Sequence, residues 1–175
     1  MFNSIIKDVK AQKAGSSLFN VIKALLINRS VQMLTLYRLA KKLKKIPLIG
    51  NVVSTVVTYV SRLIIPCEIS VDSNIEPGVY FPHPLGIVIG EGVNIKGTAT
   101  IYQNTTFGRK NSEMSSYPTI SEGCVIYSGA VIIGEIIIGK NSIVGANSIV
   151  NKSVDSNLIV AGAPAKIIKE IVYKI

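Results

Sequence analysis

The sequence predicts a mainly β fold, a parallel β-helix of six-residue repeats preceded by a short α-helical segment. Three observations support this prediction. An apolar side chain returns at nearly every sixth position from Ile69 onward, apolar residues recur at helical spacing before it, and the positive charge is concentrated in residues 1–66. With 175 residues, of which 48% are hydrophobic, the chain can bury one substantial core.

The period of six indicates one short strand and one turn in each unit, because strands repeat every two residues and helices every 3.6. Three units form one triangular coil, with the repeated side chains stacked inside and each coil bonded to the next. Glycine, serine, asparagine and aspartate crowd the positions between. The expected stacked residues are Ile69, Ile75, Phe81, Ile87, Val93, Ala99 and Thr105, and then Ile120, Ile126, Ile132, Ile138, Val144 and Val150.

The repeat is interrupted between Thr105 and Ile120, which are 15 residues apart rather than 12 or 18. The polar, turn-rich residues between them predict a loop over residues 108–118. Loops on a rigid scaffold are common places for binding and catalytic groups. We expect the β-helix to span residues 67–166 and a short tail to follow in residues 167–175.

The first segment, residues 1–66, is strongly basic. It holds eleven Lys and Arg against one acid, Asp8, for a formal charge of +10, whereas residues 67–175 sum to −1. Helical spacing predicts helices over residues 18–26 and 31–43, while the valine-rich stretch 51–65 favours helix less strongly. The charge predicts an anionic partner such as lipid, a polyanion or an acidic protein. The absence of a nucleic-acid-binding motif argues against nucleic acid.

Two interpretations of this basic segment stay open. Its apolar faces could pack on the β-helix or a neighbouring subunit with the lysines in solvent, or Lys41, Lys42, Lys44 and Lys45 could touch anionic lipid head groups. No stretch reaches the roughly 18 uninterrupted apolar residues of a membrane-spanning helix. The start lacks signal-peptide features, and two cysteines form neither a metal pattern nor a disulfide framework. We therefore expect a cytoplasmic protein, which under the second interpretation would contact the inner face of the membrane.

Three motifs carry a resemblance to a known family. His83 is followed by Gly86-Ile87-Val88-Ile89-Gly90-Glu91, Cys67-Glu68-Ile69 stands fifteen residues before it, and Ala161-Gly162-Ala163-Pro164-Ala165-Lys166 ends the repeats. With these motifs, residues 66–168 resemble the hexapeptide-repeat (left-handed β-helix) acyltransferases, and among them the serine acetyltransferases. Leu36-Tyr37-Arg38-Leu39-Ala40 is similar to the helical leader of capsule and surface-polysaccharide acetyltransferases. The resemblance implies a left-handed β-helix, acetyl-CoA as co-substrate, and a homotrimer with sites between neighbouring subunits.

His83 is the only histidine in the chain. Acetyl transfer to an alcohol requires removal of the hydroxyl proton, and an imidazole, with an ordinary pKa near 6.5, suits that step. The resemblance implies that His83 is the general base and that Glu68 orients it, as in hydrolase triads. The alternatives are a structural histidine and a surface carboxylate. Metal-dependent carbonic anhydrases share the fold but need three histidines, so we expect no metal site.

The resemblance also implies a coenzyme A site. Small side chains would let the pantetheine arm lie along the coil edge, and a lysine would meet a phosphate. Glycine, alanine and serine are equally typical of the turns of any β-helix, so this interpretation has a structural alternative. The matching positions are Gly108, Ser128, Gly129, Gly145, Ala146 and Lys166.

The sequence departs from the serine acetyltransferases at three places. Pro82 replaces the aspartate before the histidine, and Ser116-Tyr117-Pro118 stands where that group has Asp-Arg-His-Pro. Tyr117 therefore occupies the place of a substrate-facing histidine, where it either contacts the acceptor or packs the loop base. The helical segment is also much shorter. These departures favour a sugar hydroxyl of a surface polysaccharide or its precursor as acceptor, with serine O-acetylation as the alternative and a non-catalytic scaffold as the third hypothesis.

Overall fold

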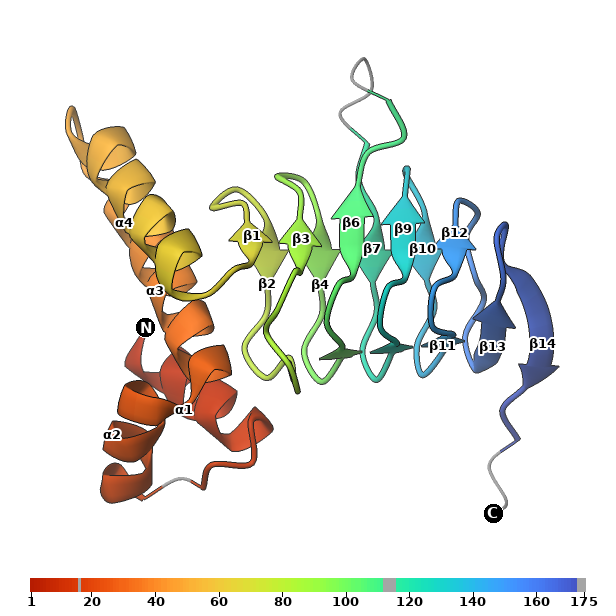
Figure 1. Ribbon diagram of the computed structural model, residues 1–175, viewed down its shortest axis with the longest axis horizontal. Helices are drawn as coiled ribbons and strands as arrows, with labels where there is room; N and C mark the ends of the chain where they lie inside the picture. Colours follow the sequence, from red (N-terminus) through yellow and green to blue (C-terminus); the bar gives the residue numbers. More distant parts are fainter. Residues whose placement is uncertain (16, 112–115, 173–175) are drawn as a thin grey trace.

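The chain forms a column of β-coils with four helices at one end (Figure 1). The computed structural model describes residues 1–15, 17–111 and 116–172. The helices are α1 (Phe2–Ala11), α2 (Leu18–Ile27), α3 (Arg29–Leu43) and α4 (Gly50–Ile64). The strands are β1 (Glu68–Ile69), β2 (Asn74–Ile75), β3 (Val88–Ile89), β4 (Asn94–Ile95), β5 (Thr100–Ile101), β6 (Thr106–Gly108), β7 (Thr119–Ile120), β8 (Val125–Ile126), β9 (Val131–Ile133), β10 (Ile137–Ile138), β11 (Ile143–Val144), β12 (Ile149–Val150), β13 (Leu158–Ala161) and β14 (Lys166–Glu170).

Three sheets form the sides of the column. Their strand orders are β1-β3-β6-β9-β12, β2-β4-β7-β10 and β5-β8-β11-β13-β14, and every pairing is parallel except the antiparallel pair β13–β14. We call them the first, second and third sheet. From β1 to β13 successive strands fall in different sheets, so each of them pairs with a strand one full coil away, whereas β14 folds back on β13. This topology confirms the predicted parallel β-helix.

Two columns of side chains fill the interior, and each repeat contributes to both. The larger column comes from the second residue of each strand and consists mainly of isoleucine. The smaller column lies two residues earlier and includes Ser73, Thr105, Ser142 and Ser148, which are buried. Its hydroxyls bond to turn backbone, as Ser142 Oγ does to Asp155 O at 2.7 Å, so few buried polar atoms lack partners.

The predicted stepping by six contains a register error at His83. Ordinary coils are 18 residues long, since Val88 pairs with Thr106 and Val131 with Ile149. Glu68, however, pairs with Val88, twenty residues later. The coil that carries His83 therefore has two extra residues.

Because of the two extra residues, stepping by six along the sequence passes from one interior column to the other. Phe81 lies in the larger column, whereas Ile87 and the residues reached from it by steps of six lie in the smaller one. The sequence count missed the shift because both columns are buried and apolar. The second interruption is real: Thr106 pairs with Val131, 25 residues later, so the coil with the predicted loop has seven extra residues. Residues 112–115 of that loop lie outside the described part of the chain.

The helical segment has a small core of its own and also joins the β-helix. Val9, Val21 and Val31 form a separate apolar cluster, while Met33 and Leu34 of α3 pack into the main core. Ser17 accepts a hydrogen bond from Asn20 N and so caps α2, as Asn28 caps α3. Helix α1 was not expected from the sequence.

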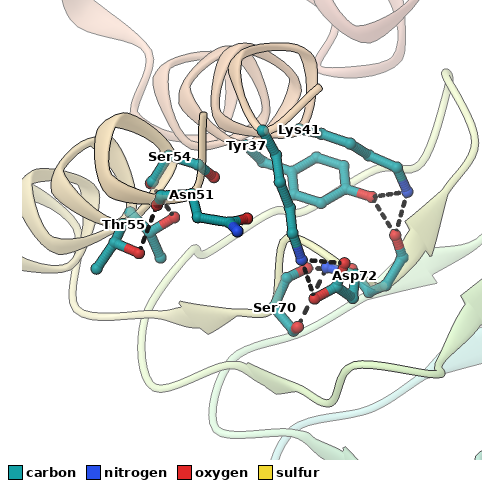
Figure 2. Close-up of polar contacts among 10 residues, drawn as sticks. Tyr37, Lys41, Asn51, Ser54, Thr55, Ser70 and Asp72 are labelled. Carbon is teal, nitrogen blue, oxygen red and sulfur yellow. Dashed lines mark hydrogen bonds and ion pairs between the residues drawn. The ribbon is translucent and has the colours of Figure 1, made fainter. Parts of the chain in front are cut away.

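Polar side chains of α3 bind the turn between β1 and β2 (Figure 2). Tyr37 donates its hydroxyl to Ser73 O at 2.7 Å, and Lys41 Nζ donates to the same oxygen. Lys44 binds both carboxylate oxygens of Asp72 at 2.6 Å. Two of the four lysines proposed for lipid contact therefore bind the β-helix instead.

An almost buried ion pair fixes α1 against α3 and the second sheet's edge. Arg38 Nε and Nη2 donate to the two carboxylate oxygens of Asp8 at 2.6 and 2.9 Å. Arg38 also donates to Ile75 O at 3.1 Å, and Gly78 N donates to Asp8 at 3.1 Å. The single acid of the helical segment thus neutralises a buried guanidinium at the first coil.

The described residues contain neither a membrane-spanning helix nor a cluster of metal ligands. Within them, none of the helices is long and apolar enough to cross a membrane. Nor does this part of the chain gather three or more histidine, cysteine or acidic side chains that could hold a metal ion.

Candidate functional site

His83 lies at the corner between the third and first sheets, where the two extra residues lengthen the turn. Phe81 is buried in the core, whereas the His83 side chain is exposed. Gly86 ends the turn with φ +64°, and a Cβ there would collide with the Asn104 side chain. Glycine is therefore needed where the long turn meets the next coil.

A row of rings runs from His83 along this corner. The centroids of the His83 and Tyr102 rings are 6.4 Å apart, and Tyr102 stacks on Tyr127 at 5.2 Å with an interplanar angle of 16°. In the following coil the equivalent position is Gly145, because Tyr127 N bonds to Val144 O and Gly145 N to Val160 O. The side chains along the corner therefore shrink abruptly after Tyr127.

Four of the predicted coenzyme positions share the corner with His83. Backbone bonds join the successive turns: Asn104 N donates to Leu85 O, Gly129 N to Gln103 O, and Asn147 N to Ser128 O. Ser128 and Gly129 thus lie two coils from His83, and Gly145 and Ala146 lie three coils away. Lys166 is exposed at the start of β14 and pairs with Ala161.

The residues at this corner fit an extended thioester arm. Gly145 and Ala146 have no side chain or a small one, so nothing projects from the edge of the column there. The exposed Lys166 lies at the end of this edge that is far from the imidazole. A flexible chain with a phosphate at one end and a reactive thioester at the other matches this polarity. This fit supports a coenzyme A edge at Ser128, Gly129, Gly145, Ala146 and Lys166, whereas Gly108 lies at another corner of the same chain.

Gly108 and Tyr117 lie at the opposite corner, between the first and second sheets. Tyr117 packs its ring on Gly90 and Gly92, where a Cβ would collide with it. Its hydroxyl donates to Glu91 Oε1 at 2.7 Å, and this bond raises the pKa of the phenol. Tyr117 therefore packs the loop base, and within a single chain it is on the other corner from His83.

Glu68 also departs from its expected partner. Its Oε1 accepts a hydrogen bond from Arg62 Nη2 of α4 at 2.9 Å, and its side chain is 57% exposed. Glu68 pairs with Val88 in the first sheet and shares a hollow of about 230 Å³ with Gly86, three residues after His83. Within one chain the carboxylate is thus near the histidine's coil but is bonded to arginine.

A larger cavity of about 450 Å³ lies between α4 and the corner of Tyr117. Its walls carry charges of both signs, from Arg62, Arg109, Glu68 and Glu91. Ser54 of α4 also lines it, and Ser54 Oγ is buried without a hydrogen-bond partner. Such a cavity can accept a small molecule that carries both a cation and an anion.

Sequence reasoning missed most of this cavity. Arg62 was counted only as part of a basic segment, and Arg109 only as part of a polar loop. Glu91 closes the quoted Gly86–Glu91 motif but was assigned no role. Its position two residues after the end of β3 was the available signal.

Comparisons with known proteins agree with this geometry. The bacterial transferase hexapeptide (six repeats) family model matches residues 117–152. The serine acetyltransferase of Buchnera aphidicola from Acyrthosiphon pisum is 35% identical over 181 residues, covering 99% of this chain and 64% of that protein. The enzyme of the same name from Synechococcus elongatus is 32% identical over 85% of this chain and 61% of its own length. The chain thus spans less than two thirds of these relatives.

Solved structures give the same result. The crystal structure of serine acetyltransferase from Brucella abortus has a TM-score of 0.86 and 27% identity, covering 98% of this chain and 70% of that one. A second structure from that organism, in complex with coenzyme A, has a TM-score of 0.87 and 26% identity, covering 99% of this chain and 69% of that one.

These matches extend over the helices as well as the coils and agree with the predicted left-handed β-helix. In sequence and fold the chain is therefore similar to the hexapeptide-repeat (left-handed β-helix) acyltransferases, and among them it is serine acetyltransferase-like.

Proposed function

We propose that this chain is an acetyl-CoA-dependent O-acetyltransferase whose acceptor is the hydroxyl of L-serine. The observation that carries the proposal is the corner that places an exposed His83 in line with a low edge ending at Lys166. The relatives with which the whole chain aligns are named serine acetyltransferases. They favour serine, the alternative acceptor in the sequence analysis, over a saccharide.

The chemistry assigned to His83 is proton transfer. Acetyl-CoA, when bound along the edge, supplies the acetyl group as a thioester. A ring nitrogen of His83 takes the acceptor's hydroxyl proton as the new C–O bond forms, and the imidazolium can return that proton to the departing thiolate. No metal takes part in this scheme.

The cavity supports an amino-acid acceptor. Arginine side chains suit a carboxylate, and Glu68 and Glu91 suit an ammonium group. In one chain this cavity and His83 lie at different corners. We therefore propose that the active site forms between subunits of a homotrimer, with the cavity of one chain facing His83 of its neighbour.

A saccharide acceptor remains the second candidate for one reason. Tyr117 stands where the resembling family has a histidine that faces the amino acid, and its hydroxyl is already bonded to Glu91. A phenol presents an aromatic face that suits a sugar ring as well as a packing surface. The acceptor assay below separates the two.

The test measures thiol release from acetyl-CoA with L-serine and with a panel of sugars, using wild type and His83→Ala. We expect release with serine, and a loss of at least about a hundredfold in kcat in the variant, as removal of a general base gives. Release with a sugar alone would support the saccharide. Failure to release thiol with any acceptor, together with failure to bind acetyl-CoA, would support a scaffold.

We also propose that α2 contacts an anionic membrane surface. One face of this helix exposes large apolar side chains to solvent, and Lys23 lies among them. A basic segment with an exposed apolar face fits interfacial binding to acidic lipid. The exposed residues are Leu18 (71%), Phe19 (73%), Ile22 (51%), Leu26 (71%) and Ile27 (66%).

Sedimentation with vesicles tests the membrane proposal. The full chain should bind phosphatidylglycerol-containing vesicles and not pure phosphatidylcholine. The double variant Phe19→Glu, Leu26→Glu should lose this binding. Val56→Glu, an exposed apolar position on α4, is the matched control and should retain it. Equal binding by the double variant and wild type would contradict the proposal.

A further inference from the structure

The strand segment just before His83 lies at the open end of the third sheet. Tyr80 pairs with Thr100 on one side, with Tyr80 N bonded to Ala99 O and Ile101 N to Tyr80 O. On its other side no further coil follows. The backbone groups of Val79 and Phe81 that face that way need partners, because unpaired buried polar groups are costly.

Two side chains of the helical segment provide those partners. Gln12 Nε2 donates to Val79 O at 2.8 Å, and Phe81 N donates to Gln12 Oε1 at 3.0 Å. Ser30 Oγ donates to Phe81 O at 2.6 Å. Gln12 and Ser30 are only 7% and 5% exposed. The glutamine amide thus replaces a neighbouring strand, and both peptide groups of Phe81 are held.

We propose that Gln12 and Ser30 are positioning residues for His83, which makes the helical segment part of the catalytic apparatus. This inference rests on the proposed function. Phe81 is only two residues from His83, and its side chain is anchored in the core at 1% exposure. The intervening Pro82 has a fixed φ, and Pro84 restricts the backbone of His83 itself. Few free torsions therefore separate the held peptide groups from the imidazole.

The lengthened turn explains why such support is needed. Its two extra residues project His83 away from the regular ladder, and the side chain is exposed. Its ring lies tilted against that of Tyr102, with the ring centroids 6.4 Å apart. A base that is displaced by about 1 Å can lose a hundredfold in rate, so a turn without this support would be a poor platform for proton transfer.

The test uses tag-free protein, in which His83 is the only histidine. The variants are Gln12→Met, which keeps the side chain's size but removes both bonds, and Ser30→Ala. The matched control is Tyr37→Phe, which removes comparable bonds from the same helical segment to Ser73 and Ile75 of the first coil. Thermal unfolding measures how much stability each of the three variants loses, so that their effects on His83 can be compared at similar losses.

The first readout is the single imidazole signal in the NMR spectrum. We expect it to shift or split in Gln12→Met and Ser30→Ala and to stay within its linewidth in Tyr37→Phe. This readout does not depend on activity. An unmoved signal in Gln12→Met would overturn the inference even if the wild type acetylates its acceptor.

The second readout is kinetic. We expect Gln12→Met to lower kcat by roughly tenfold to a hundredfold, with KM for acetyl-CoA changed less than about twofold. Tyr37→Phe should keep kcat near wild type at a similar loss of thermal stability. Equal loss of kcat in Gln12→Met and Tyr37→Phe would reduce Gln12 to a general structural contact. Inactive wild type with a shifted signal would instead reject the proposed function alone.

Discussion

Arg62 Nη2 lies 2.9 Å from Glu68 Oε1, so the last turn of α4 holds the carboxylate of the first strand. Both side chains also line the cavity of about 450 Å³. The Glu68 carboxylate, which was expected to orient His83, is therefore held by an arginine of the helical segment. Gln12 and Ser30 approach the same coil from α1 and α3. Three helices thus contact the coil ends around one histidine.

The role of Glu68 is tested by Glu68→Gln with Arg62→Ala beside it. We expect Glu68→Gln to lower kcat roughly tenfold by removing the negative charge that stabilises an imidazolium. The exposed pair should contribute under about 1 kcal/mol to stability, so unfolding in urea should change little in either variant. Unchanged kcat in Glu68→Gln would leave Glu68 as a surface carboxylate.

A site between subunits is tested by mixing inactive chains. His83→Ala removes the base, and Glu91→Ala alters the cavity. Refolded mixtures of the two variants form some sites with both intact components, so activity should return to a fraction of wild type. Thiol release measured across mixing ratios should reach a maximum near equal amounts. Mixtures that show only the sum of the two parents would place both components in one chain.

Tyr117→Phe should weaken the loop base in a pH-dependent way. The hydrogen bond to Glu91 raises the pKa of the Tyr117 phenol above its usual value of about 10. A raised pKa means that the stabilisation is full below the unfolded pKa and is lost as pH rises through the folded one. Wild type should therefore be more stable than Tyr117→Phe at pH 7 to 9, and the difference should shrink as pH rises through the raised pKa of the phenol. A constant difference across that range would contradict the assignment.

The two cysteines should be slow to react in the folded protein. Burial raises the pKa of the Cys124 thiol to about 11, and it also raises the pKa of Cys67. Cys124 Sγ also donates to Gly139 O at 3.0 Å. Because the thiolate is the reactive form, a disulfide reagent at pH 8 should label neither thiol until the protein unfolds. Rapid labelling of Cys124 in native protein would show that its coil opens.

Loss of the buried acid should release the helical segment. Asp8→Ala leaves the Arg38 guanidinium buried without its bidentate partner, which typically costs about 3–5 kcal/mol. The double variant Asp8→Ala, Arg38→Met should recover part of that loss, because it removes the unpaired charge. Denaturant unfolding of the double variant and of both single variants, Asp8→Ala and Arg38→Met, gives the coupling energy. Additive losses would show that the pair does not act as a unit.

The parts of the fold that could be predicted from the sequence are those that produce a regular six-residue repeat. The stack of coils, the loop after Gly108 and the fold of the site's scaffold follow from side chains that recur at fixed spacing. The two extra residues at His83 were not visible in the sequence. Stepping by six from Phe81 reaches Ile87 of the smaller column instead of Ile89 of the larger one, and both residues are apolar and buried. A period of six cannot distinguish two buried columns that lie two residues apart.

The resemblance assigned every residue of the candidate site, and the structure brings one group of them together at a single corner. His83, Ser128, Gly129, Gly145 and Ala146 lie in the turns of successive coils, which the six-residue period stacks. Glu68, Tyr117 and Gly108 lie elsewhere in the chain, and the partners of the first two, Arg62 and Glu91, depend on how α4 and a loop pack. Contacts across such distances have no local signature in the chain.

The lengthened turn at His83 shows that the length of a corner can vary while the strand pairing stays the same. Strand β3, which follows the turn, pairs regularly with β1 and β6, so the ladder fixes the strands but not the number of residues at a corner. Chemistry at a corner can thus be altered by insertion or deletion without changing the interior. A turn of this kind is separable from the column, and its transfer to another column of coils would also need Gln12 and Ser30, whose side chains bind its backbone.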